Sequence, residues 1–358
     1  MKQKLTIQDI AKLAGVSKAT VSRVLNHKPT VDPEIRERVM KIVNERGFVP
    51  SITATVLRGG RTQLIGVLAP PLIQPFVPEI MLGVAEVTDR TSYEVVLYTM
   101  NPQHKHSDVL DRILAMKLST GLLAIMPGQL GGHLDYLSKQ GVPIVTIEDQ
   151  VAPISTPWIG IDNESSAYEA THYLLSLGHR RIGHILGPAD YLCSRERYDG
   201  YCRALREAGL EPDPGLLWQG DFAPTGGRAC AHQIFSLPPN ERPTAIFAAN
   251  DQTAFGLIDV AGQYGVRIPD DLAVMGFDDM PIAAFAKPSL TTIRQPHREM
   301  GEIACELLLS LIDPNYPFRR NVETFSGTGE GGSKSLRILL PTKLIVRESC
   351  GAAQSVPR

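Results

Sequence analysis

The chain has 358 residues, too many for one ordinary hydrophobic core, and its 43% hydrophobic content is typical of a folded globular protein. It has no run of about eighteen apolar residues and no apolar segment behind its first lysines, so we expect neither a membrane span nor an export signal. Its five cysteines include no Cys-x-x-Cys pair, which predicts reduced thiols in a cytoplasm and no zinc site.

The charge is divided unevenly along the chain. Residues 1–62 carry twelve lysines and arginines against five aspartates and glutamates, a net charge of +7, whereas the whole chain stands at −2. The remaining residues therefore carry −9. A basic head on an acidic body is the asymmetry expected when one end of a protein binds a polyphosphate.

Residues 6–26 predict two short helices joined by a tight turn. Thr6 is placed to cap the first helix, and apolar residues recur behind it at i, i+3, i+4 and i+7. Gly15 suits the turn, and Ser17 is placed to cap a second helix that runs to about Asn26. Any small helical bundle can have this spacing, but the positive charge favours a helix-turn-helix that binds DNA.

The second helix has a donor-rich outer surface of the kind that fits a major groove. Arg23 is the first candidate for a bidentate contact to a guanine edge, Lys18 is a second, and Ala19 suits a thymine methyl. Hydroxyl side chains are expected to contact phosphate. The residues predicted to contact DNA in this region are Thr6, Ser17, Lys18, Ala19, Thr20, Ser22, Arg23 and Asn26.

A third helix, opened by Asp32 and stopped by Gly47, completes a small core. Residues 50–62 follow with weak helix propensity, which by itself indicates a linker. With this segment the chain resembles the LacI/GalR family of bacterial transcription regulators. In that family the segment becomes a helix when two of them meet in the minor groove, where a leucine wedges between base pairs. The resemblance places Leu57 at this wedge and Ala54 beside it.

From residue 63 onward, short apolar runs alternate with helical stretches, which predicts buried parallel strands covered by helices. The expected strands are 64–69, 94–99, 122–126, 143–148, 181–187, 245–249 and 272–277. The expected helices are 78–90, 108–117, 163–177, 195–208, 251–264 and 297–311. Two sets of such units indicate two doubly wound lobes with a crevice between them.

The family resemblance extends over this region and implies a periplasmic-binding-protein-like body. The predicted fold is an all-α helix-turn-helix head followed by an α/β body of two doubly wound parallel-sheet lobes. The expected parts are the head at 1–49, a hinge at 50–62, an effector-binding and dimerisation body at 63–346 and a C-terminal tail at 347–358.

The resemblance also implies three crossings between the lobes, near 161–163, 290–293 and 327–336. The N-terminal lobe is then expected at about 63–161 and 293–326, and the C-terminal lobe at about 162–292 and 327–346. The Gly/Ser-rich stretch 327–335 is predicted to be a mobile loop.

Polar and aromatic residues follow several predicted strands, where ligands bind in such folds. Arg197, in an Arg-x-x-Gly motif, matches the arginine that holds the effector in the family. Phe222 matches its aromatic platform and Asp278 its ligand-binding carboxylate. Cys193 replaces a hydroxyl common at its site, and Glu148 stands where many relatives carry aspartate. The effector-binding residues expected from the resemblance are Phe76, Glu148, Cys193, Arg197, Phe222, Asn250, Asp278 and Gln295.

Carboxylates at strand ends can instead cap the following helix, and for Asp251 and Asp279 we favour capping. In the predicted pocket, paired acceptors, one planar cation and flat aromatic faces suit a polyhydroxylated ring. A sugar or oligosaccharide is therefore the leading effector class. Phe76 and Phe222 could sandwich a purine instead.

We therefore predict a cytoplasmic, nucleoid-associated bacterial transcription regulator. It is expected to be a homodimer that represses by binding a palindromic operator in double-stranded DNA and responds to a small effector. Neither a Gly-x-Ser-x-Gly motif nor a P-loop occurs, and His104 and His106 lie in a polar loop, so no enzyme, metal or cofactor is expected. The alternative class is a sugar-binding protein without a DNA-binding role, for which residues 1–62 would have no use.

Overall fold

The computed structural model describes residues 5–25, 30–48, 62–100, 113, 118–126, 130–148, 156–322, 324–328 and 334–351. The chain divides into two units, Met1–Thr62 and Gln63–Arg358, here called the head and the body. Each unit has a hydrophobic core of its own.

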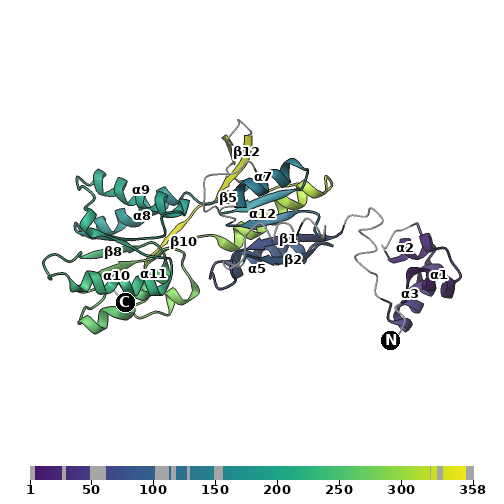
Figure 1. Ribbon diagram of the computed structural model, residues 1–358, viewed down its shortest axis with the longest axis horizontal. Coiled ribbons are helices and arrows are strands. Elements are labelled where there is room, and N and C mark those ends of the chain that lie inside the picture. Colours follow the sequence, from purple (N-terminus) through teal and green to yellow (C-terminus); the bar gives the residue numbers. More distant parts are fainter. Residues whose placement is uncertain are drawn as a thin grey trace. The chain divides into compact units, whose positions relative to one another are not determined.

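The described part of the head contains three helices, α1 (Ile7–Ala14), α2 (Lys18–Leu25) and α3 (Pro33–Arg46), shown in Figure 1. Thr6 caps α1 as predicted, because its hydroxyl accepts from the backbone N–H of the third helical residue. Gly15 has a φ of 64°, a left-handed conformation that glycine adopts readily and that turns the chain toward α2.

One small core joins the three helices. Its buried members are Ile10, Ala11, Ala14, Val21, Val24, Val39, Val43 and Phe48. Of the inward positions predicted from the helical period of α1 and α2, five are buried, whereas Ile7 and Leu25 at the helix ends are only partly buried against this core.

The N-terminal lobe of the body is built on a seven-stranded sheet in the order β11-β12-β5-β4-β3-β1-β2. Its strands are β1 (Leu64–Ala69), β2 (Glu94–Thr99), β3 (Leu122–Ile125), β4 (Ile144–Ile147), β5 (Trp158–Gly160), β11 (Thr324–Thr328) and β12 (Lys334–Leu339). Neighbours pair in parallel except β11 and β12. The described helices of this lobe are α5 (Val77–Thr88), α7 (Gly131–Lys139) and α12 (His297–Ile312).

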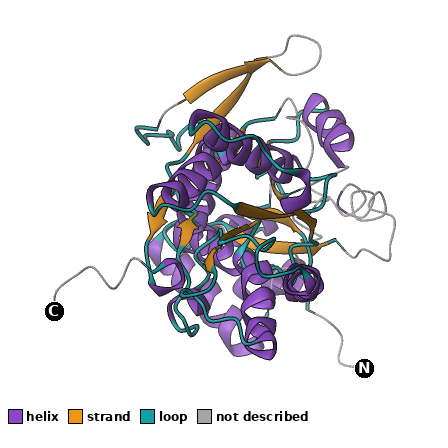
Figure 2. Ribbon diagram, turned by 90° about the vertical axis from the view of Figure 1, so that its left-hand side faces the viewer, coloured by secondary structure: helices purple, strands orange, loops and turns teal. Residues whose placement is uncertain are grey.

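The C-terminal lobe has a four-stranded parallel sheet in the order β7-β6-β8-β9. Its strands are β6 (Ile182–Leu186), β7 (Leu217–Gln219), β8 (Ala245–Ala248) and β9 (Ala273–Met275). Its helices are α8 (Asn163–Ser176), α9 (Leu192–Glu207), α10 (Pro224–Ser236) and α11 (Asp251–Ala261). Figure 2 shows helices around the strands of the body, and the predicted fold of two parallel-sheet lobes is confirmed.

Glycines bring neighbouring helices into close contact. A methyl group at Gly83 of α5 would lie 1.9 Å from the backbone oxygen of Arg298 in α12. A methyl group at Gly200 of α9 would lie 2.1 Å from the backbone oxygen of Glu164 in α8. Because the second contact sits beside Arg197, the position of this arginine depends on how closely α8 and α9 pack.

The chain crosses between the lobes in three places, and the third differs from the prediction. The first lies between β5 and α8, and the second is β10 (Thr292–Arg294), which pairs antiparallel with β13 (Lys343–Ile345). The predicted third crossing at 327–336 is wrong, because β12 pairs with β5 and extends the first sheet. The crossing lies between Leu339 and Lys343, and residues 327–328 and 334–339 belong to the N-terminal lobe.

The stretch predicted as a mobile loop at 327–335 is partly strand. Residues 327–328 pair with 334–335 in an antiparallel hairpin that projects from the lobe in Figures 1 and 2, and residues 329–333 lie outside the described part. The Gly/Ser composition of the hairpin end concealed the strands, since backbone pairing does not require β-branched side chains.

The predicted tail also begins too early. Ser349 and Cys350 are buried, and the Ser349 hydroxyl donates to the backbone oxygen of Val274 in β9 at 2.6 Å. Residues 347–351 therefore belong to the C-terminal lobe, while 352–358 lie outside the described residues. Of the predicted helix 108–117, only Ile113 is described.

Candidate functional site

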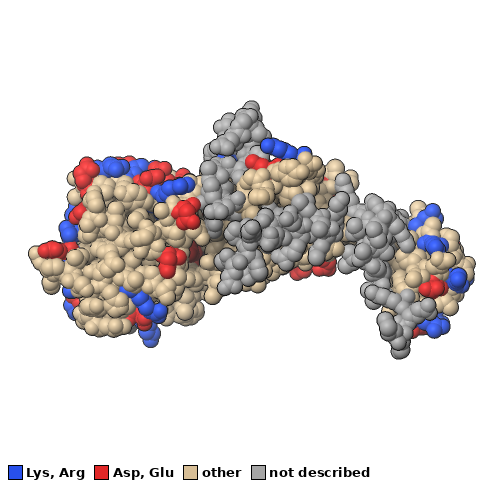
Figure 3. Space-filling view, viewed as in Figure 1, with Lys and Arg blue, Asp and Glu red and all other residues tan. Residues whose placement is uncertain are grey.

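The outer face of α2 carries the first candidate site. Ser17, Lys18, Ala19 and Arg23 are exposed, whereas Thr20 and Ser22 are half-buried. Figure 3 shows lysine and arginine side chains on the visible face of the head. An exposed helix face with two cations and small side chains is complementary in shape and charge to the major groove of DNA.

The hydroxyl groups of the head already have local partners. The Ser17 Oγ accepts from the backbone N–H of Thr20 at 3.0 Å and lies 2.9 Å from the Thr20 hydroxyl. The Thr6 hydroxyl donates to Asp9 Oδ2 at 2.7 Å. These bonds fix the helix ends, and each hydroxyl retains acceptor capacity for a further contact. Three predicted DNA contacts, Asn26, Ala54 and Leu57, lie outside the described residues.

Arg197 is the centre of the second candidate site, which lies at the carboxyl ends of β6, β8 and β9. Its side chain projects from α9 and is only 5% exposed. Its Nε donates to Asn163 Oδ1 at 3.0 Å, and its Nη1 donates to the backbone oxygen of Ala249 at 2.6 Å. The guanidinium carbon lies 3.7 Å from the centre of the Phe277 ring. Among the described residues, no acceptor is within hydrogen-bond distance of Nη2.

Asp278 supplies a carboxylate close to this arginine. Its Oδ1 accepts from Gln295 Nε2 at 2.7 Å, which joins two of the predicted ligand residues directly. Burial raises the pKa of Asp278 to about 6, although the positive charge of Arg197 acts in the opposite direction. The carboxylate is thus an acceptor held in a desolvated place beside a fixed cation.

Phe222 and Asn250 lie on the same side of the site. The Phe222 ring centre is 6.0 Å from the guanidinium carbon of Arg197, and the Tyr191 ring meets it edge-on at 5.5 Å. Asn250 Nδ2 donates to the backbone oxygen of Phe222 at 3.0 Å, while its Oδ1 accepts from the N–H of Thr253 and caps α11. Asn250 therefore holds Phe222 in place and has a structural role as well.

Cys193, Glu148 and Phe76 complete the predicted set. Burial is the main reason why the pKa of the Cys193 thiol rises to about 11; the charge of Arg197 lowers this pKa and those of Glu148 and Asp278 raise it, which places these groups in one neighbourhood. Glu148 Oε1 accepts from the backbone N–H of Ile161 at 3.1 Å. The Phe76 ring centre lies 5.7 Å from that of His297, whose pKa falls to about 3 through burial and the Arg197 charge.

Strained backbone also marks this site. Glu148, Phe222 and Asp278 have φ values of 47°, 62° and 118°, in the region that favours glycine. A non-glycine residue there costs about 1–3 kcal/mol, and such residues concentrate where a ligand is held. Three of the eight predicted effector residues therefore have a conformation that the fold must enforce.

Several residues of the site were missed by sequence reasoning. Asn163 and Phe277 contact Arg197, and His297 lies against Phe76. The Ser194 hydroxyl is buried without a partner among the described residues, and a methyl group at Gly187 would lie 2.5 Å from it. The position of Ser194 next to Cys193 was the one available signal, since the helical period did not indicate which face of α9 meets the site.

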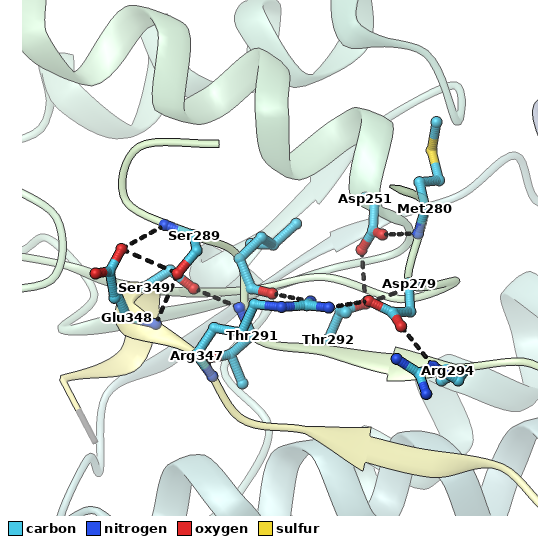
Figure 4. A network of polar contacts seen from close by, with 11 residues as sticks. Asp251, Asp279, Met280, Ser289, Thr291, Thr292, Arg294, Arg347, Glu348 and Ser349 are labelled. Carbon is cyan, nitrogen blue, oxygen red and sulfur yellow. Dashed lines mark hydrogen bonds and ion pairs between the residues drawn. The ribbon is translucent and has the colours of Figure 1, made fainter. Parts of the chain in front are cut away.

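The capping prediction for Asp251 and Asp279 is wrong. Asn250 caps α11 instead, and buried Asp251 accepts from the Thr292 hydroxyl at 2.6 Å and from the Met280 N–H at 2.7 Å. Asp279 forms ion pairs with Arg294 and Arg347, both at 2.6 Å. Figure 4 shows these carboxylates in one network with β10 and the segment after β13.

Two further observations bear on the kind of site. The described residues contain no group of three or more His, Cys, Asp or Glu that could hold a metal ion. In the same part of the chain, no helix is long and apolar enough to cross a membrane.

Known proteins similar to this chain cover both units. A family model described as bacterial regulatory proteins, lacI family, matches residues 6–51, and one described as a periplasmic binding protein-like domain matches residues 171–350. The HTH-type transcriptional regulator DegA of Bacillus subtilis (strain 168) is 32% identical over 349 residues, which cover 97% of this chain and 98% of DegA.

Two solved structures extend the comparison. The transcriptional regulator CelR–cellobiose complex is 31% identical, with a TM-score of 0.69 over 96% of this chain and 99% of that chain. The Lac repressor dimer bound to operator and the anti-inducer ONPF is 25% identical, with a TM-score of 0.82 over 97% of this chain and 99% of that chain. These relatives are transcription regulators and not enzymes, as predicted for this chain.

Proposed function

This chain belongs to the LacI family of DNA-binding transcription regulators, and we propose that it is a repressor. Its binding to a palindromic operator is controlled by a saccharide bound at Arg197. One observation carries this proposal: a fixed arginine, a desolvated carboxylate and aromatic rings converge at the carboxyl ends of the second sheet. The protein acts in the bacterial cytoplasm and on the nucleoid.

The head supplies the DNA contacts. Arg23 and Lys18 donate to base edges, and Ala19 contacts a thymine methyl, while the hydroxyl groups near them contact phosphate. One recognition helix covers only half of an operator, so the working form is a homodimer on two half-sites. The Lac repressor, whose structure as an operator-bound dimer matches 97% of this chain, supports this assembly.

The Arg197 site suits a ring that carries several hydroxyl groups. Asp278 accepts from neighbouring hydroxyls, and Arg197 Nη2 donates to a ring or hydroxyl oxygen. Phe222 packs against the C–H face of the ring. The cellobiose bound by the similar regulator CelR supports a saccharide.

The effector acts through the segments that cross between the lobes. The N–H of Asp278 donates to the backbone oxygen of Ile293 in β10 at 2.8 Å, and the adjacent Asp279 holds Arg294 and Arg347. A ligand on Asp278 therefore lies one residue from the point where two crossing segments are tied together (Figure 4). It shifts the regulator between its states only by its difference in affinity for them.

Fluorescence anisotropy tests the proposal. The full-length protein is titrated onto DNA from its own upstream region, at fixed salt because phosphate contacts make affinity steeply salt-dependent, with and without a panel of mono- and oligosaccharides. We expect tight binding that one saccharide changes. A response to purines alone would show that the effector is a purine and not a saccharide. Saccharide binding without any specific DNA binding would overturn the repressor function.

The Arg197→Ala variant tests the site. The effector response should disappear, with affinity lowered by about 100-fold or more, because a buried charged donor is lost. DNA affinity without effector should stay as in the wild type. Arg195→Ala, two residues earlier on α9 and exposed, is the matched control and should respond normally. A normal effector response in the Arg197→Ala variant would show that the saccharide does not bind at this site.

A further inference from the structure

A pocket of about 350 Å³ lies beside the Arg197 site, between the edge of the first sheet and the beginnings of α8 and α9. Trp158 of β5 and Arg337 of β12 line it from the N-terminal lobe, and Leu192 and Glu196 of α9 line it from the C-terminal lobe. These elements are labelled in Figure 1. The volume falls within the range of about 300–1,000 Å³ that small-molecule sites occupy.

Two residues belong to both the pocket and the Arg197 site. Asn163 lines the pocket and accepts from Arg197 Nε at 3.0 Å. Glu148 also lines it, and its charge acts on the Cys193 thiol next to Arg197. The pocket therefore borders the Arg197 site, with Asn163 and Glu148 at the boundary.

The walls of the pocket combine an aromatic ring with hydrogen-bonding groups. The guanidinium carbon of Arg337 lies 5.4 Å from the centre of the half-buried Trp158 ring. Gly160 allows the Trp158 ring and the Glu148 carboxylate to lie close to the backbone of β5. A methyl group at this position would lie 2.4 Å from the Trp158 ring and 2.8 Å from Glu148 Oε1. The aromatic ring and a carboxylate are thus held side by side.

The acidic groups around the pocket are not arranged for a metal ion. Asp162 Oδ1 accepts from the N–H of Ser165 and caps α8, and Glu164 pairs with Arg203. The described residues form no group of ligands that could hold a metal ion. Glu196 is partly buried, interacts with Asn163 and lines the same pocket as the aromatic ring. Flat apolar surface next to separate acceptors and one cation suits a neutral hydroxylated ring.

We propose that this pocket holds the second ring of a disaccharide effector whose first ring is bound at Arg197. The inference rests on the proposed saccharide control of the regulator. Trp158 packs on the second ring, Glu196 accepts from its hydroxyls, and Arg337 donates to its oxygens. The pocket, and not the Arg197 site, then sets the preference for an effector longer than one ring.

Isothermal titration calorimetry of the full-length protein tests this proposal. Each monosaccharide is compared with a disaccharide that contains it: glucose with cellobiose and maltose, xylose with xylobiose, and galactose with lactose. The wild type should bind one disaccharide at least about tenfold more tightly than its monosaccharide, which corresponds to about 1.4 kcal/mol. Trp158→Leu and Glu196→Gln should each bring this ratio close to one without changing monosaccharide affinity. Glu169→Gln, at an exposed position of α8, is the control and should keep the ratio.

Tryptophan fluorescence gives a second measurement. The chain has two tryptophans, Trp158 and Trp218, so Trp218→Phe leaves the pocket residue as the sole indole fluorophore. The disaccharide should shift its emission, and the monosaccharide should not. The pocket proposal is overturned, and saccharide control is not, if the wild type binds the disaccharide and the monosaccharide equally well. The same holds if both variants lose affinity equally for the two sugars. A wild type that binds no saccharide overturns both.

Discussion

The DNA-contact site of the head and the Arg197 site of the body are built from opposite kinds of contact. The described DNA-contact residues all lie between Thr6 and Arg23, on α1, α2 and the turn between them, and their positions follow from helix caps and helical period. The effector residues come from positions 76 to 295 and meet only because strand ends converge. A site of local contacts can be recognised in sequence, whereas a site of distant contacts becomes visible only in the folded sheets.

The two sites also differ in how their side chains are held. Lys18 and Arg23 stand exposed on α2, so each contributes separately to DNA affinity. In the Arg197 site, Arg197 donates to Asn163 and stacks on Phe277, and Gln295 donates to Asp278. Substitutions in this site are therefore expected to be non-additive, and substitutions on the outer face of α2 close to additive.

Val24→Asp should have the largest effect and tests whether the head is independent of the body. Val24 is fully buried, and an unpaired charge in so small a core should unfold the head. DNA affinity should fall to the non-specific level, while saccharide affinity stays unchanged in isothermal titration. Leu13→Asp, at a position of α1 that is 48% exposed, is the control and should keep the head folded. Loss of saccharide affinity in Val24→Asp would show that the two units depend on each other.

Effector affinity should depend on pH through Asp278. Burial raises the pKa of this carboxyl to about 6, and effector hydroxyls donate to its charged form. Affinity should therefore fall as the pH drops below about 6, by up to about tenfold per pH unit, and level off above it. Titration calorimetry between about pH 5 and pH 8 measures this dependence. Asp278→Asn should bind weakly with no such slope, and a flat wild-type profile would mean that the effector does not contact this carboxylate.

The smallest effect is expected for the cap of α1. Thr6→Ala removes the hydroxyl that bonds to Asp9 and should destabilise the head by about 1 kcal/mol. Thermal melting of the full chain followed by circular dichroism should register this in a head transition, with the body transition unmoved. Thr6→Ser retains the hydroxyl and should restore the wild-type value. An equal shift in both transitions would contradict the separation of head and body.

Strand prediction succeeded for strands that form a continuous apolar run of four to six residues. β1 and β2 were predicted with their observed limits, and β3, β4, β6 and β8 to within one residue at each end. The three-residue strands β5, β7, β10 and β13 were missed, because so short a segment has no readable period. Helices α7 and α10 were missed as well, and both contain consecutive glycines that weaken the helical signal.

The sequence by itself determined the helix-turn-helix and the alternation of strands and helices, since caps, turns and periods act between residues close in the chain. Likeness to a family supplied the effector residues, and the folded lobes bring Arg197, Asp278 and Phe222 together. Only the tertiary structure decided that β12 joins the first sheet, that Asp279 ties two crossing segments and that Trp158 and Arg337 line a pocket beside Arg197. The physical reason is that strand pairing and burial join residues far apart in the chain, and no local pattern records which strand becomes the neighbour.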